Sequence, residues 1–326
     1  MNKLISFLFI IFSFNLNASI LVSGYFEANQ SCPAFLSKNK KTNPNDLHVE
    51  KQQRYTLREI NRLSPDWLRI EIPVQSSSLR WVHAECGQFQ YQIQENGDCE
   101  MKPGLADSYV LALSWQPAFC QTYGYEAGKP ECLNLSETSY ASHHMTLHGL
   151  WPNQKACGQS YSYCGVAPQK NHCSYAPVEL GPVVATHLKE LMPSYAFGSC
   201  LERHEWNKHG SCQVLSSDDY FSLAMRLTRE ADNSTMGEYL RENRGLSIKQ
   251  QQLRQKIQEA FGQNADQKIY LGCKNGMLVD IFIQLPVLIP EQQPLSVLIA
   301  DAPKTDRYSG CPDHIWISDF KNGDRS

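Results

Sequence analysis

The densest group of reactive side chains in the sequence runs from His204 to Gly210 and reads His-Glu-Trp-Asn-Lys-His-Gly. At about 100° per residue on an α-helix, His204, Glu205, Lys208 and His209 would share one face. Two imidazoles, a carboxylate and an ammonium would then lie within about one helical turn. Such a set can move protons and stabilise negative charge, so we predict a catalytic helix face that ends at Gly210.

Two other interpretations of this segment remain open from spacing alone. The side chains could form an ordinary solvated face with i,i+4 pairing. A zinc site is the second alternative, although His204 and His209 are five residues apart and Lys208 between them disfavours a cation. Cys200 and Cys212 bracket the segment. Fixing a helix at both ends suits a site that needs defined geometry.

A second candidate is His148, within the apolar stretch from Met145 to Trp151. This stretch predicts a strand that ends near Pro152. A single histidine on such a strand is more often a core residue than a catalyst. Alone, His148 therefore leaves both interpretations open.

The elements that would carry these residues indicate an α+β domain with an antiparallel sheet and helices kept to one side of it. Strands are predicted at 109–115 and 145–151, and helices at 177–192, from the N-cap Ser217 to Arg229, and at 248–261 with Gly262 as the stop. Residues 268–273 and 277–285 predict a hairpin across Lys274-Asn275-Gly276, because Asn-Gly strongly favours a tight turn.

The region before this domain has a different pattern. Short apolar stretches at 20–26, 54–57, 67–72, 80–84 and 89–93 predict strands, and the alternation at 67–72 is that of a half-buried strand. The block is similar to bacterial SH3-like modules, in which a late Trp-Val pair, here Trp81-Val82, closes a small barrel. An unrelated β-rich extension is the alternative. The turn-rich segment 95–104 predicts a linker, so we divide the chain into residues 1–18, 19–98 and 99–326.

Length, charge and cysteine content restrict the class of protein. The 326 residues suggest two domains, and a net charge of −3 argues against a broad basic surface that grips nucleic acid. Residues 1–18 carry Lys3 and an apolar run of about eleven residues, which predicts a secretory signal because a membrane span needs about 20. Twelve cysteines without a Cys-x-x-Cys pair favour disulfides over thiolate metal sites. We expect an exported protein with no membrane segment.

The two histidine segments together carry a specific resemblance. His148-Gly-Leu-Trp-Pro152 with His204-Glu-x-x-Lys-His-Gly210 resembles the paired active-site segments of the ribonuclease T2 family. The strand 109–115 is similar to that family's opening strand. The context Ser199–Arg203 is most similar to the bacterial periplasmic ribonuclease I branch. The resemblance covers about residues 105–315 and leaves the N-terminal block outside it.

The resemblance implies a secreted or periplasmic endoribonuclease that cleaves single-stranded RNA through 2′,3′-cyclic phosphates. It assigns His209 as the base and His148 as the acid. Glu205 and Lys208 would stabilise the phosphorane, and His204 would hold the phosphate. Two imidazoles suit this task because their ordinary pKa of about 6.5 lets one be neutral while the other is charged. The chemistry then requires neither metal nor cofactor, and we expect a monomer whose N-terminal block has an unknown partner.

Further expectations concern the substrate and the disulfides. Trp115 and Trp151 are candidates for stacking on a base, with a place in the core as the alternative for each. Asn153 stands where some relatives carry an acidic base-contacting residue, so no base preference is predicted. We expect disulfides between the following cysteines: Cys32 with Cys86 within the N-terminal block, and Cys273 with Cys311, the latter supported by the resemblance.

Two other functions remain to be separated from this one. The chain could be a binding or inhibitory module whose histidines serve structure. It could also be a metal-dependent phosphodiesterase. RNA cleavage in the presence of EDTA would separate the three functions.

Overall fold

The computed structural model describes residues 19–72, 79–93, 99–157, 160–305 and 309–319. The expected signal sequence, residues 1–18, lies outside the described residues, as does part of the expected linker. Two compact units divide the chain. The first contains residues up to Glu71 together with Arg80–Gly97, and the second contains Ile72–Leu79 with Asp98–Ser326.

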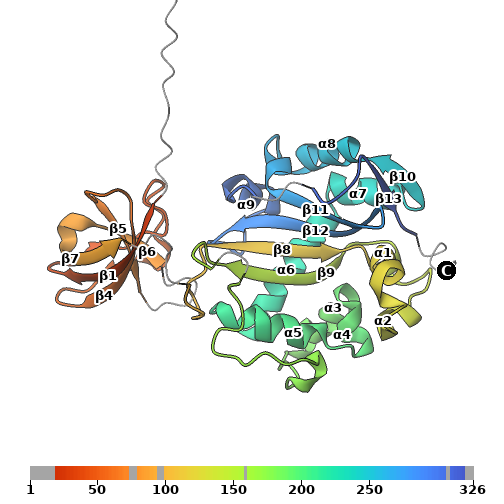
Figure 1. The fold of residues 1–326 in the computed structure, drawn as a ribbon, viewed down its shortest axis with the longest axis horizontal. Coiled ribbons are helices and arrows are strands. Elements are labelled where there is room, and N and C mark those ends of the chain that lie inside the picture. Colours follow the sequence, from red (N-terminus) through yellow and green to blue (C-terminus); the bar gives the residue numbers. More distant parts are fainter. Residues whose placement is uncertain (1–18, 73–78, 94–98, 158–159, 306–308, 320–326) are drawn as a thin grey trace, which may run out of the picture. The chain divides into compact units, whose positions relative to one another are not determined.

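The first unit is all-β (Figure 1). A five-stranded sheet has the order β6-β5-β4-β1-β7, and β2 pairs with β3 in a small second sheet. The strands are β1 (Ile20–Ala28), β2 (Cys32–Pro33), β3 (His48–Val49), β4 (Arg54–Ile60), β5 (Trp67–Glu71), β6 (Leu79–His83) and β7 (Gly87–Ile93). The five apolar stretches that predicted strands therefore all form strands of the larger sheet.

Burial along β5 departs at one residue from the alternation that the sequence predicts. Leu68 and Ile70 are buried as expected, but Arg69 between them is buried as well. Its guanidinium donates a hydrogen bond of 2.7 Å to Glu59, which satisfies the charge inside the unit. The expectation of a half-buried strand is therefore wrong at this position. The predicted disulfide between Cys32 and Cys86 is present.

The second unit is built on a six-stranded sheet of order β10-β13-β12-β8-β9, in which β11 also pairs with β12. Its pairings are antiparallel except for a short parallel contact between β12 and β13, and this contact departs from the prediction. The strands are β8 (Ser108–Ser114), β9 (Thr146–Asn153), β10 (Leu246–Lys249), β11 (Ile269–Lys274), β12 (Met277–Pro286) and β13 (His314–Ile317). Residues of β8 are almost all buried, so this strand forms the centre of the core.

Helices lie on both sides of this sheet (Figure 1), so the expectation that they are kept to one side is wrong. They are α1 (Gln116–Phe119), α2 (Pro130–Leu133), α3 (Pro182–Leu191), α4 (Pro193–Phe197), α5 (Leu201–Lys208), α6 (Ser217–Asp232), α7 (Thr235–Glu242), α8 (Gln250–Phe261) and α9 (Leu295–Asp301). The predicted helix at 177–192 starts only at Pro182. The predicted N-cap of α6 is wrong by one residue, because Ser216 rather than Ser217 accepts the hydrogen bond from the backbone of Asp219.

The predicted hairpin forms between β11 and β12. Lys274 pairs with Met277, which leaves Asn275 and Gly276 as a two-residue turn. Both turn residues have positive φ angles, of 51° and 78°, as this tight turn type requires. Strand β12 of this hairpin pairs with β8. Side chains of β12 and β8 that lie on the same face of the sheet are therefore neighbours.

Disulfides hold the loops of the second unit to this framework. All twelve cysteines are paired, and the pairs within this unit are Cys99–Cys157, Cys120–Cys132, Cys164–Cys212, Cys173–Cys200 and Cys273–Cys311. The predicted Cys273–Cys311 bond is therefore confirmed. In the part of the chain that the structure describes, no helix is both long and apolar enough to cross a membrane.

Candidate active site

A β-bulge sets the direction of His148. Ala112 of β8 pairs with Gly149, and the next residue, Leu113, pairs with Leu147. His148 is thus the extra residue on β9, with no partner opposite it. Bulges of this kind bend the strand and redirect a side chain, often beside an active site.

The bulge also brings His148 to the same side of the sheet as Trp151. In a regular strand, residues three positions apart point to opposite faces. Here the two rings lie 5.3 Å apart in an edge-to-face contact. Leu147 and Leu150 meanwhile both point into the core, where they are almost fully buried. The apolar pattern around His148 therefore belongs to core neighbours, while His148 itself faces the site.

Helix α5 carries the second group of predicted residues. Its start is fixed by the Cys173–Cys200 disulfide, and its end leads into a short 3-10 turn held by Cys164–Cys212. Cys200 precedes the helix with a φ of 67°, a left-handed conformation that is unusual for a residue with a side chain. The bracketing cysteines thus anchor both ends of the helix, in agreement with the sequence analysis.

Glu205 lies at the centre of the site and is only 1% exposed. Its Oε2 accepts a hydrogen bond of 2.7 Å from the indole N–H of Trp151. Its Oε1 lies 3.9 Å from Nε2 of His148. Burial raises the pKa of this carboxyl, and the charges of His148 and Lys208 and the hydrogen bond from Trp151 only partly oppose the rise.

His148 lies between two carboxylates. Nε2 faces Glu205, while Nδ1 lies 3.5 Å from Oδ1 of Asp280 on β12. Burial alone would lower the pKa of the imidazole, but the close contact with Asp280 and the negative charges of Asp280 and Glu205 outweigh it, so the pKa is raised. Asp280 was not among the predicted site residues. Its signal in the sequence is an acidic residue that interrupts the apolar run of β12.

His209 has the opposite electrostatic environment. It caps the C-terminus of α5, is 8% exposed, and its ring stacks on that of Trp151 at 5.1 Å. Burial and the nearby positive charge of Lys208 hold its pKa well below the usual 6.5. His209 is therefore neutral at pH 7 and free to accept a proton.

His204 stacks against a histidine that the sequence analysis missed. The rings of His172 and His204 lie 3.9 Å apart. Burial, followed by the charges of His172 and Lys208, lowers the pKa of His204 to about 3. His172 belongs to a short 3-10 turn (His172–Ser174) that the Cys173–Cys200 bond holds against α5. Nothing in the sequence pattern marked it, because its position depends on the disulfide.

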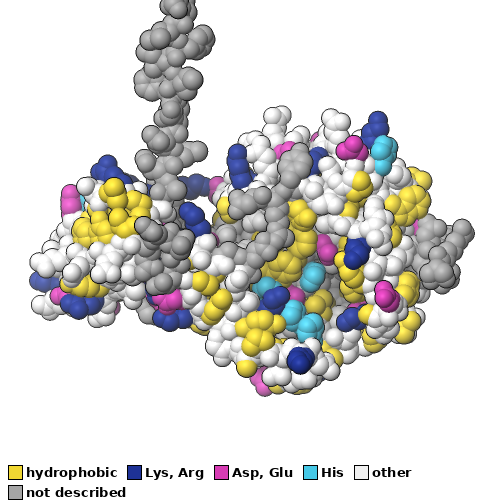
Figure 2. Space-filling view, viewed as in Figure 1, with side chains coloured by type: hydrophobic (Ala, Val, Ile, Leu, Met, Phe, Trp, Pro, Cys, Tyr) yellow, Lys and Arg dark blue, Asp and Glu magenta, His cyan; other side chains and the backbone are white. Residues whose placement is uncertain are grey.

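Lys208 supplies positive charge to the whole cluster. It lowers the pKa of His209 and of His204, and it stabilises the ionised form of Glu205. Each of the five predicted residues is therefore coupled electrostatically to at least one of the others. Figure 2 shows histidine side chains gathered with a basic side chain between hydrophobic ones on one face of the molecule.

The two candidate tryptophans differ in how far their side chains are buried. Trp115 is 2% exposed, and its indole N–H donates a hydrogen bond of 2.7 Å to the carbonyl of Ser318. Neither ring face is open to a base, so the prediction that Trp115 stacks on substrate is wrong, and the residue belongs to the core. Trp151 is partly exposed and lies within the site.

Among the residues that the structure describes, no group of three or more histidine, cysteine, aspartate or glutamate side chains is arranged to hold a metal ion.

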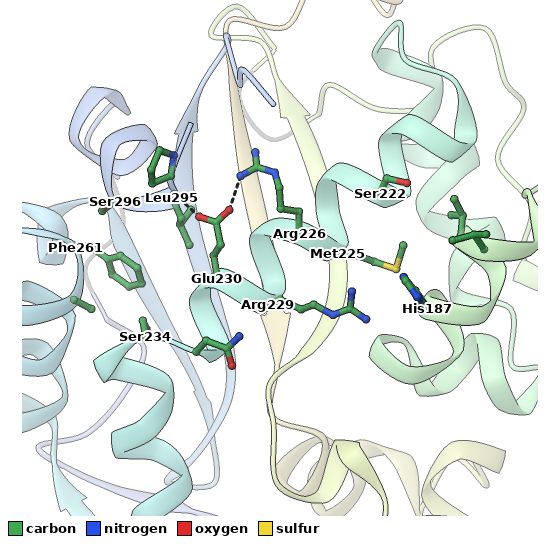
Figure 3. A pocket seen from close by; sticks show the side chains of 15 residues that line it. His187, Ser222, Met225, Arg226, Arg229, Glu230, Ser234, Phe261, Leu295 and Ser296 are labelled. Atoms are coloured by element: carbon green, nitrogen blue, oxygen red, sulfur yellow. Dashed lines mark hydrogen bonds and ion pairs between the residues drawn. The ribbon is translucent and has the colours of Figure 1, made fainter. Parts of the chain in front are cut away.

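A cavity of about 620 Å³ lies elsewhere, between α3, α6, α8 and α9 (Figure 3). There Glu230 accepts hydrogen bonds from Arg226 and from the backbone of Leu295. None of the predicted site residues lines this cavity.

Comparison with known proteins places the chain in a family. Residues 106–292 match the model of the Ribonuclease T2 family. The chain belongs to the ribonuclease T2 family. Membership assigns it the endonucleolytic cleavage of RNA through 2′,3′-cyclic phosphates without a metal ion.

Curated ribonucleases are similar to part of this chain. Ribonuclease I of Escherichia coli K12 is 30% identical over 203 residues, which are 56% of this chain and 76% of that protein. A ribonuclease of Aeromonas hydrophila is 30% identical over 146 residues, which are 44% of this chain and 54% of that protein. Ribonuclease T2 of Homo sapiens is 29% identical over 93 residues, 27% of this chain and 33% of that protein.

Comparison with solved structures gives matches over about two thirds of the chain. The self-incompatibility associated SF11 ribonuclease of Nicotiana alata covers 65% of this chain and 98% of its own, at 19% identity and a TM-score of 0.44. Ribonuclease MC1 from bitter gourd seeds covers 64% of this chain and 99% of its own, at 18% identity and a TM-score of 0.41.

Proposed function

We propose that the chain is an exported endoribonuclease in which His148 is the general acid and His209 the general base. One observation carries the assignment. The environment raises the pKa of His148 and lowers that of His209, although both rings contact Trp151. Titratable groups whose environments separate their pKa values in this way are suited to opposite roles. Between those two pKa values, the acid is protonated and the base is neutral.

In the first step, the base removes the proton from the 2′-hydroxyl of RNA. The resulting oxygen attacks the adjacent phosphorus and forms the cyclic phosphate. His209 is suited to this step because its imidazole is neutral at pH 7. Its position at the end of α5, stacked on Trp151, fixes the ring in one orientation.

The departing 5′-oxygen needs a proton when the P–O bond breaks. His148 is suited to give it because the two neighbouring carboxylates favour its charged form. Hydrolysis of the cyclic phosphate then uses the same groups in reverse, with His148 accepting a proton from water. The alkaline limb of the pH profile should report His148, and the acidic limb His209.

The remaining residues of the cluster act on the phosphate. A fixed cation such as Lys208 stabilises the charge that develops on the phosphorane. Glu205 balances this charge and favours the protonated form of His148. His204 is neutral above pH 3, so it would hold the phosphate as a hydrogen-bond donor rather than as a cation.

The substrate is single-stranded at the point of cleavage, because only an unpaired segment lets the 2′-oxygen align with the leaving group. Trp151 keeps part of its surface exposed and remains the candidate for stacking on a base. Its indole N–H is already engaged by Glu205, so the ring also positions the site. Export agrees with the pairing of all twelve cysteines, which requires an oxidising compartment.

The test is incubation with single-stranded RNA in excess EDTA, followed by chromatography of the early products. We expect cleavage to persist and 2′,3′-cyclic phosphate ends to appear first. Loss of cleavage in EDTA would indicate a metal-dependent phosphodiesterase. No cleavage with or without EDTA would favour a binding module, and early 5′-phosphate ends would contradict the mechanism.

A further inference from the structure

We propose that Asp280, oriented by Ser114, is a positioning residue that holds the imidazole of His148 with Nε2 directed toward the leaving oxygen. The inference rests on the proposed role of His148 and adds two residues outside both histidine segments. Neither is among the site residues predicted from the sequence, and they lie on the predicted strands 109–115 and 277–285.

The sheet brings the three residues together. Asp280 of β12 and Ser114 of β8 are paired directly across the two strands. The hydroxyl of Ser114 donates a hydrogen bond of 2.7 Å to Oδ1 of Asp280. Ser114 is in turn paired with Thr146 of β9, whose hydroxyl donates to the Ser114 carbonyl at 3.1 Å. Three adjacent strands thus fix the carboxylate beside the bulge that carries His148.

The imidazole needs such a partner. Nδ1 of His148 is buried and makes no hydrogen bond within the described residues. Oδ1 of Asp280 lies 3.5 Å from it. Hydrogen bonds of catalytic groups are often long in the free enzyme and shorten when substrate binds. A small rotation of either side chain would close this one and satisfy a buried polar atom that otherwise costs stability.

The two carboxylates beside His148 face different nitrogens of its imidazole. Glu205 is fully buried, is held by Trp151, and faces Nε2. Asp280 is 22% exposed and faces Nδ1 from the opposite side. A proton held on Nδ1 by Asp280 leaves Nε2 as the nitrogen that exchanges a proton with substrate. An aspartate that fixes tautomer and orientation in this way is established for catalytic histidines of hydrolases.

The charged groups around His148 also set when it is protonated. Burial lowers its pKa, Asp280 from β12 and Glu205 from α5 raise it, and Lys208 from α5 lowers it. The charge of His148 in turn lowers the pKa values of His204 and His209. Replacing Asp280 by the isosteric, neutral asparagine removes one of the two raising charges. The pKa of His148 must then fall, and the acid is lost at a lower pH.

The experiment compares the full-length protein with Asp280→Asn across the pH range. We expect kcat/KM to fall about tenfold or more at pH 8, with a much smaller change at pH 5. The loss should lie in kcat, with KM nearly unchanged, because the proposal gives Asp280 a role in positioning His148 and none in holding the phosphate. Ser114→Ala should shift the alkaline limb in the same direction but less. Asp313→Asn removes the same charge from an exposed position and should shift nothing.

A second readout does not depend on activity. NMR titration of the His148 ring should show its pKa lowered in Asp280→Asn and unchanged in Asp313→Asn. An equal loss of kcat/KM at pH 5 and pH 8, or an unshifted His148 titration, would overturn the proposal. If His148→Ala kept full activity while Asp280→Asn still shifted the ring's pKa, the coupling would stand and the proposed acid would be wrong.

If Asp280→Asn does not fold, Asp280→Glu keeps the charge on a longer side chain. It should retain the alkaline limb of the wild type with a lower kcat, since charge is preserved and geometry is not. An alkaline limb shifted as far by Asp280→Glu as by Ser114→Ala would overturn the proposal in the same way.

Discussion

Gly149 leaves the space that the carboxylate of Glu205 occupies. A Cβ atom at position 149 would overlap Oε2 of Glu205 and lie 2.6 Å from the indole nitrogen of Trp151. The glycine next to His148 is therefore required by the close approach of α5 to β9. The requirement is steric and does not depend on an unusual backbone angle, since Gly149 does not have a positive φ.

Gly149→Ala should therefore lower kcat by about 10²-fold while the protein still folds. The added methyl displaces the carboxylate and breaks its hydrogen bond to Trp151. Stability should fall by about 1–3 kcal/mol, the usual cost of overpacking. Steady-state kinetics and denaturant unfolding measure the two effects. In the background of Glu205→Ala, the same change should cost little further activity, and an additive loss would contradict the steric explanation.

Removing either proton-transfer group should have the largest kinetic effect. We expect His148→Ala and His209→Ala each to lower kcat by about 10²–10⁴-fold, which is about 3–5 kcal/mol of barrier. His204→Ala should do less and act partly through KM, as a phosphate-positioning group would. His187→Ala is the control, because His187 is exposed and lines the separate cavity. If His204→Ala were as severe as the others with KM unchanged, the roles would need to be exchanged.

The cluster should also make stability depend on pH. The unfolded chain binds a proton at His204 near pH 6.5, but the folded chain binds it only near pH 3. The unfolded state therefore gains a proton first as the pH falls, and this residue's contribution to stability is lost between about pH 6.5 and 3. The raised pKa values of Glu205 and His148 act in the opposite direction. Comparing the wild type with a His204 variant isolates the contribution of His204 to the pH dependence of stability.

His204→Asn should accordingly flatten the fall in stability on acidification relative to the wild type. Urea unfolding at a series of pH values between 7 and 4 measures it. His187→Asn should leave the wild-type dependence unchanged because that side chain is exposed. A pH dependence of His204→Asn that matches the wild type would show that burial of the imidazole does not control its protonation.

Much of the second unit could be predicted from periodicity and turn chemistry. The Asn275-Gly276 hairpin and the end of α8 at Gly262 depend on local backbone preferences, which a short window of sequence contains. The cluster of reactive side chains on α5 could also be predicted, because its members lie within a short window of sequence. Boundaries were less certain: α3 begins five residues later than expected, at Pro182, which is suited to the first turn of a helix.

What could not be predicted depends on contacts between distant segments. Asp280 and Ser114 reach His148 only because β12, β8 and β9 are adjacent. His172 reaches the site through a disulfide whose pairing does not follow from spacing. Trp115 has an aromatic side chain that could stack on a base. Its hydrogen bond to the carbonyl of Ser318 instead places it in the core. Each case needs the tertiary structure, because residue type and local period were equally compatible with the alternative.

The N-terminal block raises a last question, namely whether catalysis needs it. The residues assigned to chemistry lie between Ser114 and Asp280, all within the second unit. We expect a protein that begins at Asp98 to fold and to keep kcat/KM on a dinucleotide within a few-fold of the full chain. Starting there retains Cys99 and its disulfide to Cys157. Starting at Pro103 would leave Cys157 unpaired and cost about 2–4 kcal/mol of stability.

Circular dichroism and kinetics on the two truncated proteins decide the matter. A shortened protein that is folded yet a hundredfold less active would have lost about 2.7 kcal/mol of transition-state stabilisation. That result would mean that the first unit contributes to the reacting centre, contrary to the prediction. Activity that is retained on a dinucleotide but lost on long RNA would instead assign the first unit to substrate binding. The start at Pro103 separates these effects from a simple loss of the Cys99–Cys157 bond, because its defect should be in stability and not in kcat at low temperature.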